Sequence, residues 1–355
     1  MIEKTILVVS LQFRPAHVSH LVASYKQYEE LGYYPLLWVH PDFIPFLPSD
    51  IRYILRPNKE EIRQVQFAIF WFPSLKNILA ILRLRYVFGA KILYVYHEPW
   101  EKYSIYRKSG NTHKWIARFY LKNLIGHIFL LMSDAVLLPS KKAVSLYCHS
   151  WSRCVNCRYH YFRLLYDDED DIANIKRIYF SYIGTVSPDH AFAEYVDFIY
   201  QVYKNGELCE LKFLIATKYV IEESDKIREL MASGRLVVIA GHPMTNDEIN
   251  TYYKQSLCVW NAYNRTTQSG VLAKAFMFGT PAIICYNNVS EFVMNYKNVI
   301  AIQNNTDYNE ILTALNTIIA EFSTYSINAR QSFDAFFFYR TSNNVMIDII
   351  KSLNL

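Results

Sequence analysis

The chain has 355 residues, 52% of them hydrophobic, which is enough for two domains that each bury a core. Its longest apolar stretch, residues 125–139, is broken by polar residues, and its N-terminus has no signal-peptide pattern. These features exclude a transmembrane helix and predict a cytoplasmic protein. Residues 1–165 carry 22 Lys and Arg against 10 Asp and Glu, a net of +12, whereas residues 166–355 carry 15 against 22, a net of −7. The first half is therefore expected to meet an anionic partner, such as phospholipid head groups, a lipid pyrophosphate or nucleic acid, unless ordinary surface charge is merely segregated.

The first elements predict the opening βαβ unit of a Rossmann-like domain. Residues 5–11 form an apolar strand, residues 19–31 a helix and residues 35–39 a second strand. The first turn has no G-x-G-x-x-G, which disfavours a dinucleotide dehydrogenase. His17 and His20 in this turn are candidate ligand contacts, and loop histidines with no chemical task are the alternative.

Two later segments of this half combine apolar residues at helical spacing with Lys and Arg. They lie at residues 75–88, after a predicted strand at 67–72, and at residues 114–132. Each segment is either a helix packed on the sheet or a basic, aromatic-edged surface that rests on a membrane.

A strand at residues 90–96 runs into the segment His97-Glu98-Pro99-Trp100-Glu101. The carboxyl end of a strand is where α/β folds bind ligands, so His97 is a candidate site residue. A buried histidine that only caps the strand is the alternative. Glu98 and Glu101 are acid/base candidates by residue type, and an inverting enzyme would use one of them as its base.

A stretch with three cysteines and a histidine follows residues 134–143, which close the first domain. Cys148, Cys154, Cys157 and His160 contain a single C-x-x-C, and their spacing fits no common zinc module. We therefore expect reduced thiols and no metal site. The acidic run YDDEDD at residues 166–171 is the predicted linker between domains.

The second half has a regular succession of strands. They are predicted at residues 178–183, 211–216, 236–240, 257–260, 282–285 and 299–302. A polar loop after the fourth strand leads to a helix that begins at Gly270 and ends at Gly279-Thr280-Pro281, and the chain is helical from residue 308 onward. In such a βαβ unit the free N–H groups and the dipole at the start of the helix bind anions.

Three segments of this unit resemble the nucleotide-sugar site of family 4 glycosyltransferases, which have the GT-B fold. They are Ser269-Gly270, AFMFGTP at 275–281 and SEFV at 290–293. The resemblance implies an α/β protein with two Rossmann-like domains that face each other across a cleft and a C-terminal helix that crosses back to the first. We therefore expect an N-terminal acceptor domain at 1–165, a nucleotide-sugar domain at 166–330 and a C-terminal helical segment at 331–355.

The chain departs from the family pattern at charged positions. Thr266 and Lys274 replace the two glutamates of the family's E-x7-E. The loop that matches G-R-x4-K-G keeps Gly184 but lacks the Arg and the Lys that grip the donor pyrophosphate. Arg265 or Lys274 is a candidate for the missing positive charge. Loss of both carboxylates is consistent with a deoxythymidine diphosphate sugar as donor, because deoxyribose has one hydroxyl fewer.

The resemblance and these positions together give the candidate site residues. The catalytic candidates are His97, Glu98 and Thr266. The acceptor-binding candidates are His17 and His20. The donor-binding candidates are Gly184, Thr185, His190, Gly241, His242, Arg265, Ser269, Gly270, Val271, Lys274 and Glu291.

The implied function is transfer of a hexosyl or deoxyhexosyl group from a nucleotide-diphosphate sugar to a glycan or a lipid-linked oligosaccharide, with retention of configuration. The implied setting is bacterial surface-polysaccharide synthesis (O-antigen, lipopolysaccharide or capsule) by a peripheral protein on the inner face of the cytoplasmic membrane. No cofactor, metal or nucleic acid is expected. The alternatives are a nucleotide-sugar epimerase of the same fold and a catalytically degenerate protein that binds a sugar nucleotide or a partner.

Overall fold

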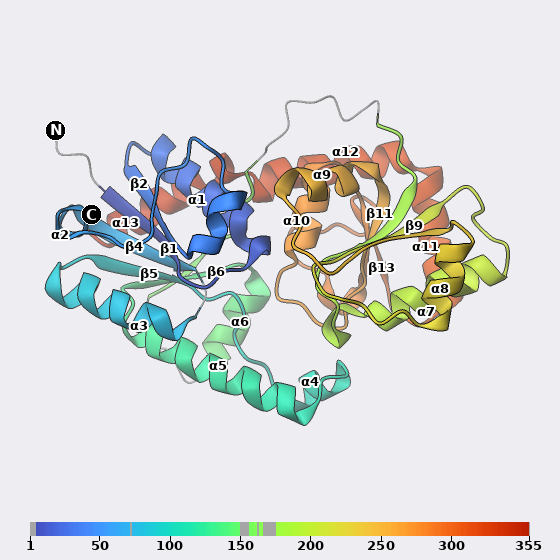
Figure 1. Cartoon of the computed structure of the whole chain (residues 1–355), viewed down its shortest axis with the longest axis horizontal. Coiled ribbons are helices and arrows are strands. Elements are labelled where there is room, and N and C mark those ends of the chain that lie inside the picture. Colours follow the sequence, from blue (N-terminus) through green and yellow to red (C-terminus); the bar gives the residue numbers. More distant parts are fainter. Residues whose placement is uncertain (1–4, 72, 150–155, 162, 166–174, 355) are drawn as a thin grey trace. The chain divides into compact units, whose positions relative to one another are not determined.

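The chain forms two compact units in a computed structural model that describes residues 5–71, 73–149, 156–161, 163–165 and 175–354 (Figure 1). The first unit comprises residues 1–108, 112–165 and 336–355, and the second comprises residues 109–111 and 166–335. Each unit is built on its own parallel sheet.

The first sheet has seven parallel strands in the order β3-β2-β1-β4-β5-β6-β7. The strands are β1 (Thr5–Ser10), β2 (Tyr34–Val39), β3 (Tyr53–Ile54), β4 (Val65–Trp71), β5 (Lys91–Val95), β6 (Ala135–Leu138) and β7 (Cys157–Tyr159). After β3 the chain returns to the other side of β1 and continues outward from β4. The switch point of this sheet, where parallel α/β folds bind ligands, therefore lies between β1 and β4.

Helices cover both faces of the first sheet, which explains why its strands are apolar throughout. Ile6 and Val8 of β1 pack toward α1 and α13, whereas Leu7 and Val9 pack toward α3, α5 and α6. The helices of this unit are α1 (Val18–Glu30), α2 (Lys59–Arg63), α3 (Leu75–Leu82), α4 (Tyr103–Lys108), α5 (His113–Leu131), α6 (Lys141–His149) and α13 (Asn343–Ser352).

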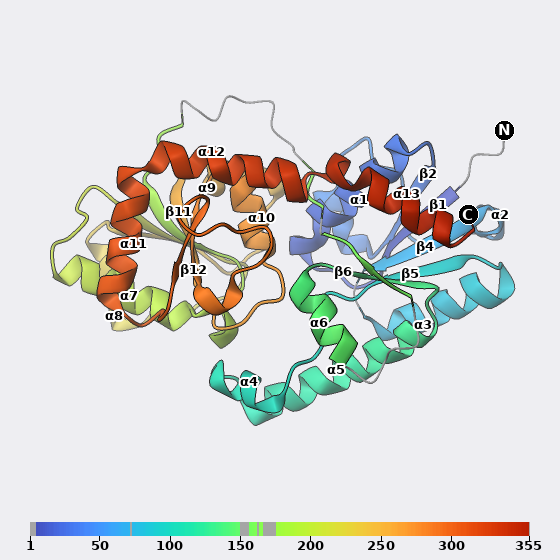
Figure 2. The same cartoon turned by 180° about the vertical axis from the view of Figure 1, so that it is seen from behind.

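The end of the chain belongs to the first unit (Figure 2). Met346 and Ile350 of α13 are buried in the same core as Tyr25 of α1. The Gln27 side-chain amide of α1 donates to the Tyr339 carbonyl at 3.0 Å and to Ser342 Oγ at 3.1 Å. The expected return of a C-terminal helix to the first domain is thus confirmed.

The second sheet has six parallel strands in the order β10-β9-β8-β11-β12-β13. The strands are β8 (Tyr179–Ile183), β9 (Lys212–Ala216), β10 (Leu236–Ile239), β11 (Ser256–Asn261), β12 (Ala282–Cys285) and β13 (Val299–Ile302). The helices are α7 (Phe192–Lys204), α8 (Asp225–Ala232), α9 (Asn246–Gln255), α10 (Gly270–Met277), α11 (Tyr308–Ala320) and α12 (Phe322–Ser332). Here the strand order reverses between β8 and β11, which places the switch point between them.

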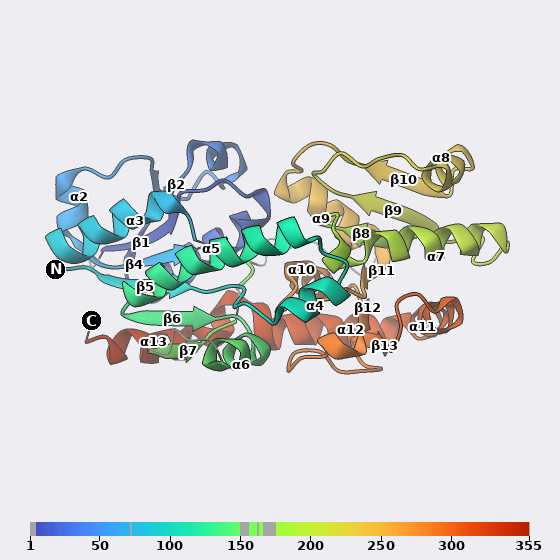
Figure 3. The same cartoon turned by 90° about the horizontal axis from the view of Figure 1, so that it is seen from below.

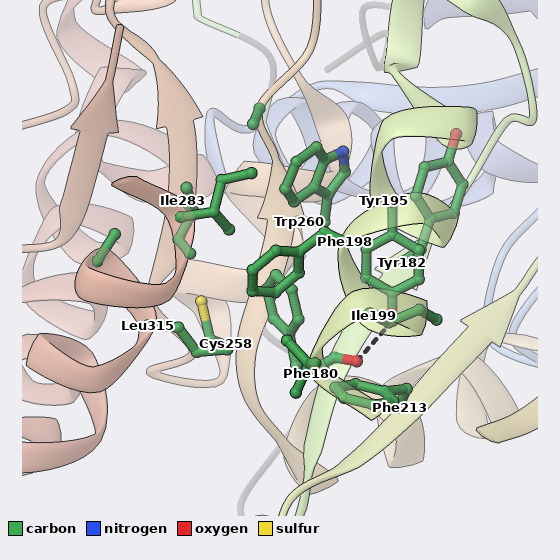
Figure 4. Close-up of a cluster of buried hydrophobic side chains, with 14 of the residues drawn as sticks. Phe180, Tyr182, Tyr195, Phe198, Ile199, Phe213, Cys258, Trp260, Ile283 and Leu315 are labelled. Carbon is green, nitrogen blue, oxygen red and sulfur yellow. Dashed lines mark hydrogen bonds between the residues drawn. The ribbon is translucent and has the colours of Figure 1, made fainter. Parts of the chain in front are cut away.

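Aromatic side chains fill the core between this sheet and helices α7, α8 and α11 (Figure 4). Trp260 and Phe180 come from neighbouring strands and lie 6.2 Å apart between ring centroids. Tyr195 of α7 packs against both rings, and its hydroxyl donates to the Phe180 carbonyl at 2.7 Å and to the Leu214 carbonyl at 3.1 Å. This core holds β8 and β11 in place and so fixes the loops that follow them.

The predicted fold class and most predicted elements are confirmed. The segment predicted as one helix at 75–88 is an α-helix to Leu82, continued by a π-helical turn, η3 (Arg83–Val87). Strands β3 and β7 were not predicted, because two or three residues are too few to establish a pattern. The predicted linker at 166–171 lies outside the described residues. None of the described helices combines the length and the apolar character that crossing a membrane requires.

Candidate functional site

Two loops meet at the switch point of the second unit. One joins β8 to α7 and the other joins β11 to α10. The His190 ring of the first loop stacks on the Tyr263 ring of the second, with centroids 4.3 Å apart and planes at 13°. The backbone N–H groups of Asn264 and Arg265 donate to the Asp189 carbonyl at 2.9 and 3.2 Å. The two loops that hold the sequence-predicted residues Thr185, His190 and Arg265 are therefore in direct contact.

Gly184 allows the first loop to approach α10 closely. Its φ is +126°, and a Cβ atom built on it would lie 3.1 Å from Val271 Cγ2 in the first turn of α10. Residues with side chains rarely adopt this backbone conformation. The glycine therefore allows the loop to lie directly against the helix start that the sequence predicts as an anion site.

The start of α10 is fixed by hydrogen bonds at its N-cap. Ser269 Oγ accepts from the Leu272 N–H at 3.2 Å and from the Asn261 side-chain amide at 2.7 Å. The cap satisfies one of the free N–H groups of the first turn, and Asn261 ties the cap to the end of β11. The remaining N–H groups of the first turn, together with the helix dipole, favour an anion here.

Gln268 supplies a second, independent sign of a ligand site. Its side chain is only 5% exposed, and neither its amide oxygen nor its nitrogen has a hydrogen-bond partner among the described residues. A buried amide without partners costs about 1–3 kcal/mol. A ligand at the α10 N-terminus with polar groups within reach would remove that cost.

Two cations near this loop are buried. Arg265 is 4% exposed and Lys274 is 7% exposed. Lys274 projects from the second turn of α10, and its ammonium group donates to Asn246 Oδ1 at the start of α9. Thr266 lies between them in sequence and is partly buried. The two positions where the family has glutamates thus hold a hydroxyl and a buried cation.

The other donor-site candidates of this unit lie farther from the switch point. Gly241 and His242 are exposed in the loop after β10, which is separated from β8 by β9. Glu291 follows β12 and is partly buried. The structure places Gly184, Thr185, His190, Arg265, Ser269, Gly270 and Val271 in the two loops and the first turn of α10.

The first unit has a corresponding arrangement at its own switch point. His20 lies at the start of α1 and stacks on Trp71 at the end of β4, with centroids 5.6 Å apart and planes at 12°. Its Nδ1 lies 3.0 Å from the Arg163 carbonyl, so this nitrogen is the donor. The ring is thereby held in one orientation at the edge of the sheet.

Cationic groups surround His17 in this unit. Desolvation, followed by the positive charges of Arg14, His20, His97 and Lys122, lowers the pKa of His17 well below its ordinary value. Burial and Arg14 also lower the pKa of Lys122 on α5. His97, which is far from His17 and His20 in the sequence, therefore belongs with them to one electropositive cluster.

One carboxylate lies beside this cluster, and a second glutamate follows it in the sequence. Glu98 is close enough to Lys122 to oppose the lowering of its pKa. Glu101 is held through its backbone, whose N–H donates to Tyr106 Oη at 3.0 Å and whose carbonyl accepts from Tyr120 Oη at 2.9 Å. A cluster of cationic groups with one adjacent carboxylate is suited to an anionic ligand.

No group of three His, Cys, Asp or Glu side chains within the described ranges is arranged to hold a metal ion. Cys154, one of the residues in the cysteine-containing stretch, lies outside those ranges. Cys148 is exposed, and burial raises the pKa of the Cys157 thiol to about 11.

No family model and no curated protein matches this sequence, but solved structures match nearly its whole length. Sucrose-phosphate synthase from Thermosynechococcus elongatus superposes with a TM-score of 0.71 at 13% identity, over 99% of this chain and 99% of that one. Anabaena HepE in complex with UDP-glucose superposes with a TM-score of 0.70 at 12% identity, over 98% and 99%. The fold is GT-B.

GT-B proteins with different activities are among these structures. A protein described as a UDP-N-acetylglucosamine 2-epimerase of Listeria monocytogenes superposes with a TM-score of 0.59 at 12% identity, over 99% of this chain and 97% of that one. At these identities the likeness establishes the GT-B fold, and the activity has to be argued from this chain's own residues.

Several residues of the two candidate sites were not predicted. Gln268, Tyr263 and Asn261 lie in the loop after β11, and Arg14 and Lys122 join the cluster around His17. The polar composition of loop 261–269 was the available signal for the first three. Lys122 carries no such signal, since it comes from a helix more than a hundred residues from Arg14 in the sequence.

Proposed function

We propose that this chain is a glycosyltransferase whose second unit binds a nucleotide-diphosphate sugar. The observation that carries the proposal is the α10 N-terminus at the switch point, with its Ser269 cap and the buried Gln268 amide beside it, which has no hydrogen-bond partner in the described part of the chain. Support comes from structures of the same fold that contain UDP-glucose, such as that of HepE.

In this proposal the diphosphate lies against the first turn of α10. The N–H groups of Gly270 and Val271 donate to it, and Gly184 leaves room for it to approach the backbone. Gln268 donates to a phosphate or sugar oxygen. Arg265 and Lys274 supply positive charge in place of the Arg and Lys of the family loop.

Catalysis is assigned to His97, Glu98 and Thr266. His97 and Glu98 follow β5, and Thr266 lies in the loop after β11. Departure of the nucleoside diphosphate is assisted by the helix N-terminus and the buried cations, which stabilise the charge that develops on it. We propose that transfer of a hexosyl or deoxyhexosyl group proceeds with retention, by analogy with the resembling family.

The acceptor is assigned to the cluster at the first switch point, where His17 and His20 lie with Arg14 and Lys122. Its positive charge suits a glycan or a lipid-linked oligosaccharide that carries a pyrophosphate. We propose a role in bacterial surface-polysaccharide synthesis, such as that of O-antigen, at the inner face of the cytoplasmic membrane.

The position of Lys274 favours a donor nucleotide that contains deoxyribose. The buried ammonium group occupies the position of the glutamate that the family resemblance assigns to the ribose hydroxyls. Deoxythymidine diphosphate is therefore expected to bind more tightly than UDP or GDP. Tighter binding of UDP or GDP would contradict this assignment.

A catalytically degenerate protein that binds a sugar nucleotide is the second candidate, and the Thr266 and Lys274 replacements favour it. An epimerase of the same fold is the third. The three differ in what they do to a bound donor: transfer to an acceptor, no turnover, or inversion at a sugar carbon without an acceptor.

A thermal-shift series with nucleoside diphosphates tests the donor site. At about 100 times Kd a ligand adds about 2.7 kcal/mol to the free energy of unfolding, which raises Tm by roughly 5–10 °C for a unit of this size. The shift is expected to disappear in Gln268→Ala and Lys274→Ala. It is expected to persist in the control Lys226→Ala, an exposed lysine of α8 that pairs with Asp197.

Assays of donor turnover with and without acceptor then separate the candidates. Transfer of the sugar to an acceptor supports the glycosyltransferase. A nucleotide shift with no turnover of any donor supports the degenerate protein, and acceptor-independent conversion of the sugar supports the epimerase. No shift with any nucleotide would contradict all three.

A further inference from the structure

The first unit exposes an apolar face on two neighbouring helices. On α3 and its extension η3, Leu75, Leu79, Leu82 and Tyr86 are exposed at spacings of four, three and four residues, which places them on one side. Leu79 is 77% exposed and Leu75 is 65% exposed. Ala80 and Ile81 on the opposite side of α3 are buried against the sheet.

Helix α5 repeats this pattern beside it. Leu121, Leu124, Ile128 and Leu131 are exposed at spacings of three, four and three residues, and Leu121 is 61% exposed. Figure 3 shows α3 and α5 running along the same side of the first sheet. Their C-terminal ends are joined by a hydrogen bond from Arg85 to the Met132 carbonyl at 3.1 Å. We call these eight exposed residues on two neighbouring helices the α3–α5 face.

The charged residues on the two helical segments of the α3–α5 face are all basic. Residues 75–88 and 113–132 contain no Asp or Glu. Lys76, Arg83, Lys114 and Arg118 are exposed at its edges, and Arg85 is paired with Asp134 at 2.7 Å. Water-exposed leucines with a rim of cations match the boundary between acyl chains and anionic head groups.

We propose that the α3–α5 face docks this protein onto an anionic phospholipid surface. A second copy of the chain is a less suitable partner, because a two-fold symmetric contact through this face would place the lysines and arginines of one copy close to those of the other, where they repel. An anionic lipid surface suits both the apolar and the basic residues of the face, because the leucines can enter the acyl boundary while the lysines and arginines lie among phosphate groups.

The docking face and the acceptor cluster share helix α5. Lys122 of α5 belongs to the electropositive cluster around His17, whereas its neighbour Leu121 belongs to the α3–α5 face. Both α3 and α5 precede strands that they cover, so their N-terminal ends lie at the carboxyl edge of the sheet, where His97 follows β5. An acceptor embedded in the bilayer would thus reach the cluster along α5. This last step rests on the proposed function, but the docking does not.

Vesicle flotation of the full-length protein tests the docking. We expect the protein to bind vesicles of phosphatidylcholine that contain about one-third phosphatidylglycerol, and to bind vesicles of phosphatidylcholine alone at least about tenfold more weakly. Binding to the anionic vesicles should weaken as the salt concentration rises from about 0.1 M to about 1 M. The double variant Leu79→Glu/Ile128→Glu is expected to reduce the partition coefficient by about tenfold or more. The control Ile327→Glu makes the same change at a 59% exposed position of α12 in the second unit and should leave binding unchanged.

Three outcomes would overturn the proposal. They are absence of binding to the anionic vesicles, equal binding to neutral vesicles, and wild-type binding by the double variant. A wild-type dimer that the double variant converts to a monomer would assign the face to a second copy instead. The nucleotide thermal shift of the double variant checks that it is folded, and its persistence separates failure of docking from failure of the proposed donor site.

Discussion

Replacement of Gly184 by alanine tests whether the close approach of the β8 loop to α10 builds the candidate donor site. The backbone conformation at φ +126° costs a residue with a side chain about 1–3 kcal/mol. The new Cβ would also lie 3.1 Å from Val271 Cγ2, so one of the two must move, and such overpacking costs about 1–3 kcal/mol. We expect Gly184→Ala to lower the free energy of unfolding by about 2–6 kcal/mol and Tm by roughly 4–24 °C.

The assay is calorimetry of the thermal unfolding transition that shifts when nucleotide binds. Two further variants provide the comparisons. Gly206→Ala, after α7, also has a positive φ (+67°) but meets nothing within 4 Å, so it should cost only the roughly 1–2 kcal/mol of the left-handed conformation. Val271→Ala should restore part of the stability lost in Gly184→Ala, because it removes the contacting methyl group. The reasoning is refuted if Gly184→Ala is no worse than Gly206→Ala, or if the nucleotide shift survives undiminished.

Two further predictions concern stability. Burial, followed by the charge of Arg163, lowers the pKa of His160 well below its ordinary value, so the unfolded chain binds a proton below about pH 6.5 that the folded chain does not. The free energy of unfolding should therefore fall as pH decreases from about 7 to 5, by up to about 1.4 kcal/mol per pH unit from this group. Urea titrations at several pH values should show a shallower fall for His160→Gln than for the unmodified protein. The same dependence of stability on pH in both proteins would contradict this. Arg177 donates to the Ser256 carbonyl at 2.8 Å and to Thr280 Oγ1 at 2.7 Å. Arg177→Ala should therefore lower the free energy of unfolding by about 3 kcal/mol or more in the same titrations, whereas Arg228→Ala, at an exposed position, should lower it by under about 1 kcal/mol. Similar losses in both variants would be evidence against this prediction.

The fold was largely predictable because its two sheets are parallel and covered on both faces. Each strand is therefore a short apolar run with a loop at either end, as in β1 and β13, and the pattern is readable from the sequence. The π-helical turn η3 was not predictable, since its residues continue the helical pattern of α3.

The candidate site was predictable only in part. Ser269 and Gly270 follow from the rules for helix starts, and Gly184 from its place after a strand. Gln268 is one of several polar residues in its loop, and only burial without a partner distinguishes it. The contact between His190 and Tyr263 depends on which strands are neighbours, which a single sequence does not state.

The first unit is discontinuous, and this affects the order in which the chain can fold. Its core includes Met346, Ile349 and Leu353, which a ribosome adds only after the entire second unit has been made. During synthesis the face of the first sheet that packs on α1 and α13 therefore lacks α13 until residues 166–335 have been made. Contacts such as that from Gln27 to Tyr339 span more than three hundred residues, and loop closure over such a distance is slow. The second unit is thus expected to become protease-resistant first during translation, although it lies later in the sequence.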